Sequence, residues 1–216
     1  MMKRLASIDV LRAIAILLMI QVHFVENLSP REASSAALYD LSEVLGMLPA
    51  PLFTFLVGLS LWLWLRRETG LGRSELELSK VVVRRGLFLS GAGLAFAVVI
   101  WLPEEVFDWD ILTLLGASTL ILFRLREWSP QKLVGLAILV LLISPPLRTA
   151  TGYASHWRGE EYIYRFTMRD LVLGFLLQGY FPLLPWVVFP LVGFATGKRC
   201  WGDESGVAAC SVGGEA

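Results

Sequence analysis

Six apolar segments follow one another along this chain, and they constrain the fold more than any other feature. They cover residues 8–25, 45–65, 81–102, 111–123, 133–143 and 171–197. A helix needs about 20 residues to cross a bilayer, so the fourth and fifth segments need flanking residues to span it. The sequence predicts an all-α, polytopic transmembrane bundle of about six helices, with five or seven left open. We therefore expect the protein to lie in a lipid bilayer.

Composition excludes several other classes of protein. Hydrophobic residues make up 56% of the 216 residues and charged residues only 18%, which is too apolar for a soluble core of this size. The net charge is zero and no basic tract is interleaved with aromatic residues, so we expect no nucleic-acid partner. The only cysteines, Cys200 and Cys210, have a spacing that fits no common zinc pattern, and no metal site is predicted.

Both ends of the chain carry further signals. Lys3 and Arg4 precede an apolar run, as in a signal peptide, but no small-residue cleavage site follows, so we interpret the run as a retained first helix. We expect residues 1–199 to form one transmembrane domain and the Gly-, Ser- and Ala-rich residues 200–216 to form a flexible tail. The absence of a targeting peptide and the short chain favour a prokaryotic plasma membrane.

The last apolar segment is interrupted by residues that break helices. Gly179, Pro182, Pro185 and Pro190 lie within it, and prolines at this spacing are incompatible with one regular helix. The sequence therefore predicts a half-helix at residues 171–178 that leads into a spanning segment.

Basic residues predict how the chain is oriented. Lys and Arg collect in cytoplasmic loops, and placing both termini in the cytoplasm puts 13 of the 19 basic residues on that side. The exception is the loop at residues 145–169, which holds four arginines together with Tyr, His and Trp residues. This loop either binds an anionic or sugar-like ligand or forms an interfacial aromatic belt whose arginines pair with lipid headgroups.

The first helix carries a polar stripe. At 100° per residue, one narrow arc contains Asp9, Arg12, Met19, His23 and Glu26. Ionisable groups are costly in lipid, so we expect this face to point into the bundle or a hydrated cavity. Asp9 and Arg12 are three residues apart and are expected to pair, whereas His23 lies about 16 Å further along the helix.

His23 is the leading catalytic candidate. A neutral imidazole accepts a proton near neutral pH, which suits a general base. The structural alternative is a histidine that only hydrogen-bonds across a helix interface, and Asp9 with Arg12 has a similar alternative as a structural ion pair. Arg84 and Arg85 either hold phosphates or anchor the third helix at the cytoplasmic surface.

Four segments carry a resemblance to a known family. They read RLASIDVLRAIAILLMIQVHF, PAPLFTFLVGLSLWLWLRR, FDWDILTLLGASTLILF and GYFPLLPWVVFPLVGFATGK, in that order. Over residues 4–198 the chain resembles membrane acyltransferases related to heparan-α-glucosaminide N-acetyltransferase. The resemblance implies transfer of an acetyl or other acyl group from cytosolic acetyl-CoA or acyl-CoA to an amine or hydroxyl, often of a sugar.

The resemblance also implies roles for individual residues. His23 deprotonates the acceptor or carries the acyl group, Asp9 orients Arg12, and CoA phosphates are bound by Arg12, Arg84 and Arg85. A transporter or permease subunit, in which the stripe lines a path, and a non-catalytic membrane scaffold are the alternatives. Homo-oligomers are left open, as is a truncated bundle, because relatives commonly continue with further helices.

Overall fold

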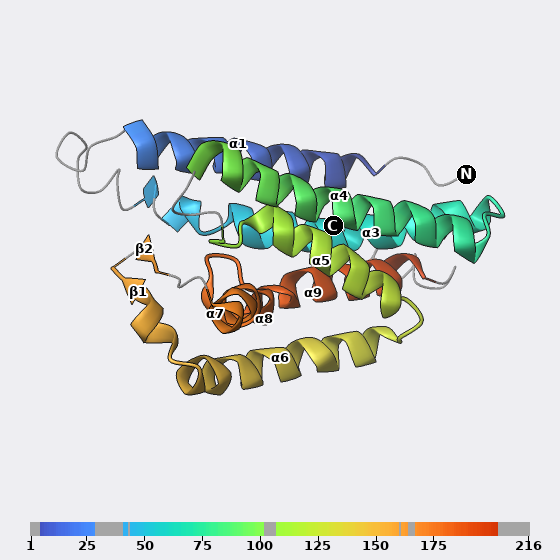
Figure 1. The fold of residues 1–216 in the computed structure, drawn as a ribbon. Helices are drawn as coiled ribbons and strands as arrows, with labels where there is room; N and C mark the ends of the chain where they lie inside the picture. Colours follow the sequence, from blue (N-terminus) through green and yellow to red (C-terminus); the bar gives the residue numbers. More distant parts are fainter. Residues whose placement is uncertain are drawn as a thin grey trace.

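The computed structural model is almost entirely helical (Figure 1). It describes residues 5–28, 41–42, 44–101, 107–159, 161–163 and 167–202. The longer helices are α1 (Ala6–Leu28), α3 (Pro49–Gly70), α4 (Glu75–Trp101), α5 (Ile111–Arg124), α6 (Pro130–Ala150) and α9 (Val188–Trp201). Shorter elements are η1 (Tyr153–His156), the antiparallel strands β1 (Trp157–Arg158) and β2 (Glu161–Tyr162), α7 (Met168–Leu173), the π-helix η2 (Gly174–Gln178) and α8 (Leu183–Trp186).

The predicted transmembrane bundle is confirmed. Five helical stretches are long and apolar enough to cross a membrane, namely Ala6–Val25, Val44–Gly70, Glu75–Ile100, Pro130–Ala150 and Met168–Trp201. One further apolar helix, α5, has only 14 residues and is shorter than these five stretches. Large apolar side chains point outward from the bundle, among them Leu17, Val99 and Leu142, each at least 66% exposed. These faces suit lipid rather than water.

Helix α6 extends beyond the apolar run that predicted it. It begins at Pro130, where the side chain of Ser129 accepts a hydrogen bond from the backbone N–H of Lys132, and it continues through Pro145 and Pro146. Neighbouring hydroxyls help to satisfy carbonyls that prolines leave unpaired in membrane helices. Arg148, which the sequence placed in the following loop, therefore belongs to the last turn of α6, and that part of the prediction is wrong.

The predicted half-helix is confirmed. Helix α7 continues into η2 and ends before Gly179, after which Pro182 precedes α8 and then α9. At the break, the backbone of Gly179 lies very close to that of Asp108. A Cβ at Gly179 would lie only 2.8 Å from the carbonyl oxygen of Asp108. Glycine therefore allows the broken segment to pack against the residues that precede α5.

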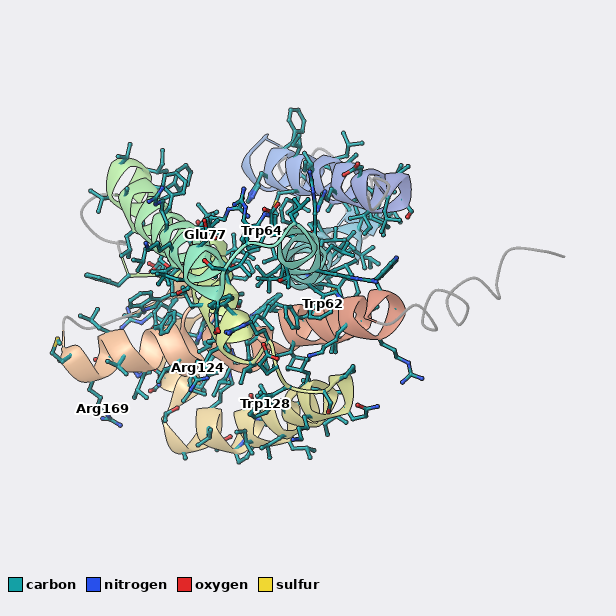
Figure 2. The ribbon with its side chains drawn as sticks, turned by 90° about the vertical axis from the view of Figure 1, so that its right-hand side faces the viewer. Trp62, Trp64, Glu77, Arg124, Trp128 and Arg169 are labelled. Atoms are coloured by element: carbon teal, nitrogen blue, oxygen red, sulfur yellow. The ribbon has the colours of Figure 1, made fainter. Side chains whose placement is uncertain are left out.

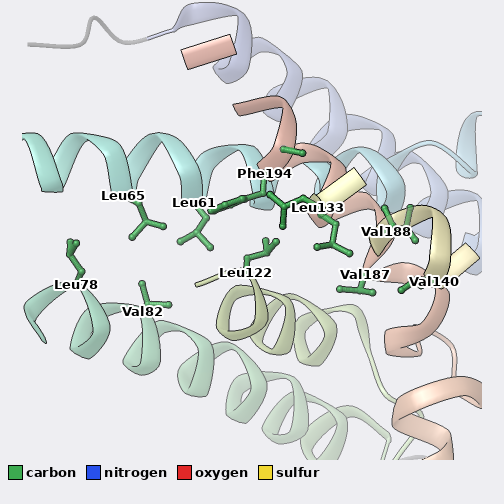
Figure 3. Packing of buried hydrophobic residues seen from close by; sticks show 13 residues of the cluster. Leu61, Leu65, Leu78, Val82, Leu122, Leu133, Val140, Val187, Val188 and Phe194 are labelled. Atoms are coloured by element: carbon green, nitrogen blue, oxygen red, sulfur yellow. The ribbon is translucent and has the colours of Figure 1, made fainter. Parts of the chain in front are cut away.

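Helices α3 and α9 form the centre of the bundle. A Cβ at Gly58 would lie 2.0 Å from the carbonyl oxygen of Pro190, and a Cβ at Gly193 would lie 2.0 Å from that of Phe55. Such small residues let helix backbones approach closely. The adjoining core is shown in Figure 3, and its members include Leu61 and Leu65 of α3, Val82 of α4, Leu122 of α5, Leu133 of α6 and Phe194 of α9.

The two ends of the bundle differ in chemistry. We call the end where α3 ends, α4 begins and α9 ends the basic pole, at the right of Figure 1 and facing the viewer in Figure 2. There the ammonium of Lys198 donates to the carbonyls of Arg126, at 2.7 Å, and Trp128, at 2.8 Å, which ties α9 to the turn between α5 and α6. We call the opposite end, which carries β1 and β2, the hairpin pole. Which pole faces the cytoplasm stays a prediction.

Candidate functional site

Asp9 and Arg12 form the predicted ion pair on α1, and the pair extends to α3. Arg12 Nη1 lies 2.9 Å from Asp9 Oδ1, and Arg12 Nη2 donates to Ser60 Oγ at 2.6 Å. The hydroxyl of Ser60 in turn donates to the carbonyl of Leu56. Both charged side chains are partly exposed, at 44% for Arg12 and 32% for Asp9. The guanidinium is therefore held in place while part of it remains accessible to a ligand.

Arg85 of α4 contacts α3 as well. Its guanidinium carbon lies 4.7 Å from the ring centroid of Trp64, a cation–π contact. Trp64 follows Ser60 by one turn, or about 6 Å along α3, and in the end-on view it lies between α1 and α4 (Figure 2). Helix α3 thus brings Arg12 and Arg85 to the same stretch of its surface. Arg84 is exposed beside Arg85 on α4.

A shallow apolar hollow, largely open to the outside, adjoins the ion pair on the surface of α1. It has a volume of about 490 Å³ and is lined by Ala6, Asp9, Val10 and Ala13 of α1. Its walls are mostly aliphatic, and Asp9 is its only charged lining residue among those described. The basic pole therefore combines accessible cations with an apolar surface.

His23 lies toward the other end of α1 and is exposed, so it does not point into the bundle, and the hydrated cavity that the sequence allowed as the alternative stays a prediction. The charge of His23 acts on Asp110, which caps α5 by accepting a hydrogen bond from the backbone N–H of Ile111. Burial raises the pKa of the Asp110 carboxyl, while Ile111 and then His23 act in the opposite direction. An imidazole on α1 thus influences a carboxyl at the start of α5 electrostatically.

The raised pKa of Asp110 has a measurable consequence for stability. In the folded protein its carboxyl binds a proton at a pH where the unfolded chain has already lost it. The stabilisation of the fold by protonated Asp110 is therefore fully present below 3.8, the ordinary pKa of an aspartate carboxyl. It is lost as the pH rises through the raised pKa of the folded state. Asp110→Asn keeps a good N-cap but cannot titrate. We expect the wild type to lose stability relative to Asp110→Asn across this window, measured by thermal unfolding at closely spaced pH values. Parallel profiles for the two proteins would contradict the assignment.

The hairpin pole contains a polar cavity of about 280 Å³. Its polar lining residues are Thr151, Ser155, His156, Arg158, Arg169 and Asp170. All of them except Asp170 come from the loop that the sequence associated with an anionic or sugar-like ligand, although Tyr164 and Arg165 of that loop lie outside the described residues.

The aromatic residues of this loop pack on one another. Trp157 lies 5.4 Å from Tyr162 and 5.2 Å from Tyr180, measured between ring centroids. Tyr162 is buried, and burial, followed by the nearby Asp170 and Asp108, raises the pKa of its phenol to about 12. An interfacial belt would expose such rings to headgroups, so that alternative is wrong for Tyr162.

Three residues of these sites were not predicted from the sequence as functional candidates: Ser60, Trp64 and Asp110. Only Asp110 had a local signal, since an acidic residue directly before an apolar run is typical of a helix N-cap. Among the described residues, no group of three or more His, Cys, Asp or Glu side chains could hold a metal ion.

Comparison with known proteins gives one match. The family model described as "Heparan-alpha-glucosaminide N-acetyltransferase, catalytic" matches residues 4–212. No curated protein and no solved structure matches the chain. The match covers every helix and strand described above, including both poles.

Proposed function

Because the chain belongs to the heparan-alpha-glucosaminide N-acetyltransferase catalytic family, we propose that it transfers an acetyl group from acetyl-CoA to an amine or hydroxyl of a sugar-like acceptor at the membrane. The observation that carries the proposal is the convergence of Arg12 and Arg85 on one stretch of α3. On this proposal the basic pole faces the cytoplasm, where acetyl-CoA is made, and the membrane is the plasma membrane.

The basic pole supplies the groups that a CoA donor needs. Phosphates of CoA would bind Arg12, Arg84 and Arg85, because guanidinium groups form charge-assisted and often bidentate hydrogen bonds with phosphate. Asp9 and Ser60 hold the Arg12 guanidinium in a fixed orientation, which lowers the entropy lost on binding. The apolar hollow beside Asp9 offers a surface for the aliphatic part of the donor.

His23 is suited to the transfer step. Its neutral imidazole takes a proton from the acceptor as the acceptor nitrogen or oxygen attacks the thioester carbonyl. The C–S bond then breaks, an amide or ester forms, and the CoA sulfur leaves as a thiolate that takes up a proton. Asp110 stabilises the imidazolium formed in this step. In the alternative, His23 attacks the thioester first and carries the acetyl group. His23 lies about 16 Å along α1 from Arg12, so the pantetheine arm of the donor has to run along this helix.

The donor site is tested by thermal unfolding of the detergent-purified protein with and without acetyl-CoA. At 100 times its dissociation constant, a ligand stabilises the folded state by about 2.7 kcal/mol. We expect acetyl-CoA to raise the unfolding temperature, and Arg12→Gln or Arg85→Gln to reduce that rise strongly. Arg199→Gln removes an exposed charge at the end of α9 and serves as the control. The absence of any shift with acetyl-CoA or longer acyl-CoAs, or equal shifts in all variants, would reject the proposal.

A further inference from the structure

The cavity at the hairpin pole has an excess of positive charge. Arg158 and Arg169 contribute two positive charges against the single negative charge of Asp170, which leaves +1 with a neutral His156. Within the described part of the chain, neither arginine forms an ion pair with a carboxylate. Lys and Arg are normally concentrated in loops on one side of the membrane and depleted on the other. The hairpin pole lies opposite the basic pole, so this asymmetry does not explain the presence of Arg158 and Arg169.

His156 is held in one orientation at the wall of this cavity. Its ring Nδ1 lies 3.2 Å from the carbonyl oxygen of Ile163, which can only accept, so Nδ1 carries the proton. The backbone of the same two residues is joined by a hydrogen bond from Ile163 N–H to His156 O at 2.7 Å. Nε2 is therefore the ring atom left to bind a ligand, and in the neutral imidazole it accepts a hydrogen bond.

The walls behind the cavity are firmly connected. The indole of Trp157 donates to the carbonyl of Gln178 at 3.1 Å, and the fully buried Gln178 amide donates to the carbonyl of Thr151 at 2.9 Å. Arg148 donates to the carbonyl of Leu177 at 2.9 Å and stacks on Tyr153. These bonds join α6, β1 and η2, so the cavity is preorganised rather than a gap between loose loops.

We propose that this cavity binds a phosphate ester that carries hydroxyl or amino groups beside the phosphate. The two guanidinium groups suit the phosphate oxygens. The buried carboxylate of Asp170 and Nε2 of His156 accept hydrogen bonds from neighbouring hydroxyl or amino groups. A volume of about 280 Å³ is near the lower limit for small-molecule sites and suits a headgroup or a single sugar. Glycerophosphate lipid headgroups and soluble sugar phosphates share this chemistry.

This proposal concerns binding and does not require acetyl transfer. The test uses the full chain in nanodiscs of phosphatidylcholine, titrated with glycerol 3-phosphate, glucose 6-phosphate or inorganic phosphate, and in parallel nanodiscs that contain phosphatidylglycerol. The variants are Arg158→Gln, Arg169→Gln, their double variant and Asp170→Asn. Arg124→Gln, an exposed arginine at the basic pole (Figure 2), is the matched control.

We expect one of two positive results. Binding of the soluble esters would identify the ligand as a soluble phosphate ester, whereas a rise in the unfolding temperature with phosphatidylglycerol would identify it as a lipid headgroup. Each arginine variant should weaken binding by about tenfold, and the double variant by about 100-fold, since each removes a charge-assisted contact. Asp170→Asn should weaken the hydroxylated esters more than inorganic phosphate. The thermal shift with acetyl-CoA should persist in the double variant, which separates this cavity from the donor site. Absence of an effect in both arms, or equal binding by the wild type and the double variant, would overturn the proposal.

Discussion

Gly58→Ala is expected to destabilise the bundle by about 3 kcal/mol or more, at the upper end of what overpacking costs. The added methyl would lie 2.0 Å from the carbonyl oxygen of Pro190 and 2.9 Å from the backbone nitrogen of Phe194. Both neighbours are backbone atoms of α9, so no side-chain rotation can relieve the contact. Moving α9 away would also separate Gly193 from Phe55, because the two close approaches belong to the same helix pair.

The measurement is the unfolding temperature in detergent, together with the fraction of protein that elutes as a single species. Gly91→Ala is the matched control, because a Cβ at Gly91 meets nothing within 4 Å. Gly91 lies inside α4, where alanine is favoured over glycine by about 0.5–1 kcal/mol. The two substitutions should therefore act in opposite directions. Equal stability of Gly58→Ala and the wild type would mean that α3 and α9 do not pack as described.

His23→Gln is expected to lower kcat for acetyl transfer by about 100- to 10,000-fold, the usual contribution of a positioned general base. Glutamine keeps a polar side chain but cannot take a proton near neutral pH. The donor site lies far along α1, so the thermal shift with acetyl-CoA should be unchanged. Release of the CoA thiol in the presence of an amino-sugar acceptor measures the rate.

Phe24→Leu is the control for this substitution, since Phe24 is the next residue on α1 and is 62% exposed. Asp110→Asn should reduce the rate less than His23→Gln, because it removes only the neighbour of the base. Mass spectrometry of the protein after incubation with acetyl-CoA alone separates the two roles of His23, because only an acyl carrier retains a covalent acetyl group. Full turnover by His23→Gln would exclude both roles.

Hydropathy was sufficient to predict the membrane bundle and the interrupted last segment. Lipid requires long apolar helices, and the glycine and prolines after Gln178 have strong local effects on the backbone. The end of α6 could not be predicted in the same way. Pro145 and Pro146 normally end a helix in water, but here the helix continues to Ala150. Whether a proline ends a membrane helix depends on its surroundings, which the local sequence does not encode.

Within the candidate sites, the sequence could predict only contacts between residues that are close together in the chain. Asp9 and Arg12 are three residues apart on one helix, so their pairing follows from helical geometry. The contacts of Arg12 with Ser60 and of Arg85 with Trp64 depend on which face of α3 meets α1 and α4. Likewise, the exposure of His23 and its electrostatic effect on Asp110 depend on how the helices pack, which helical periodicity alone does not determine.

The short helix α5 has a consequence for the barrier that separates the two compartments. With 14 residues it is about 21 Å long, about 9 Å less than the hydrocarbon thickness of a typical bilayer. An ion pair between Arg126 and Glu75 holds the C-terminal end of α5 beside the start of α4. A 14-residue helix anchored there is too short to span the hydrocarbon layer by itself. Local thinning of the bilayer is one way in which a short membrane helix is accommodated. On the proposed function, a thinner hydrocarbon layer at the start of α5 would shorten the apolar path that an acetyl group has to cross near His23.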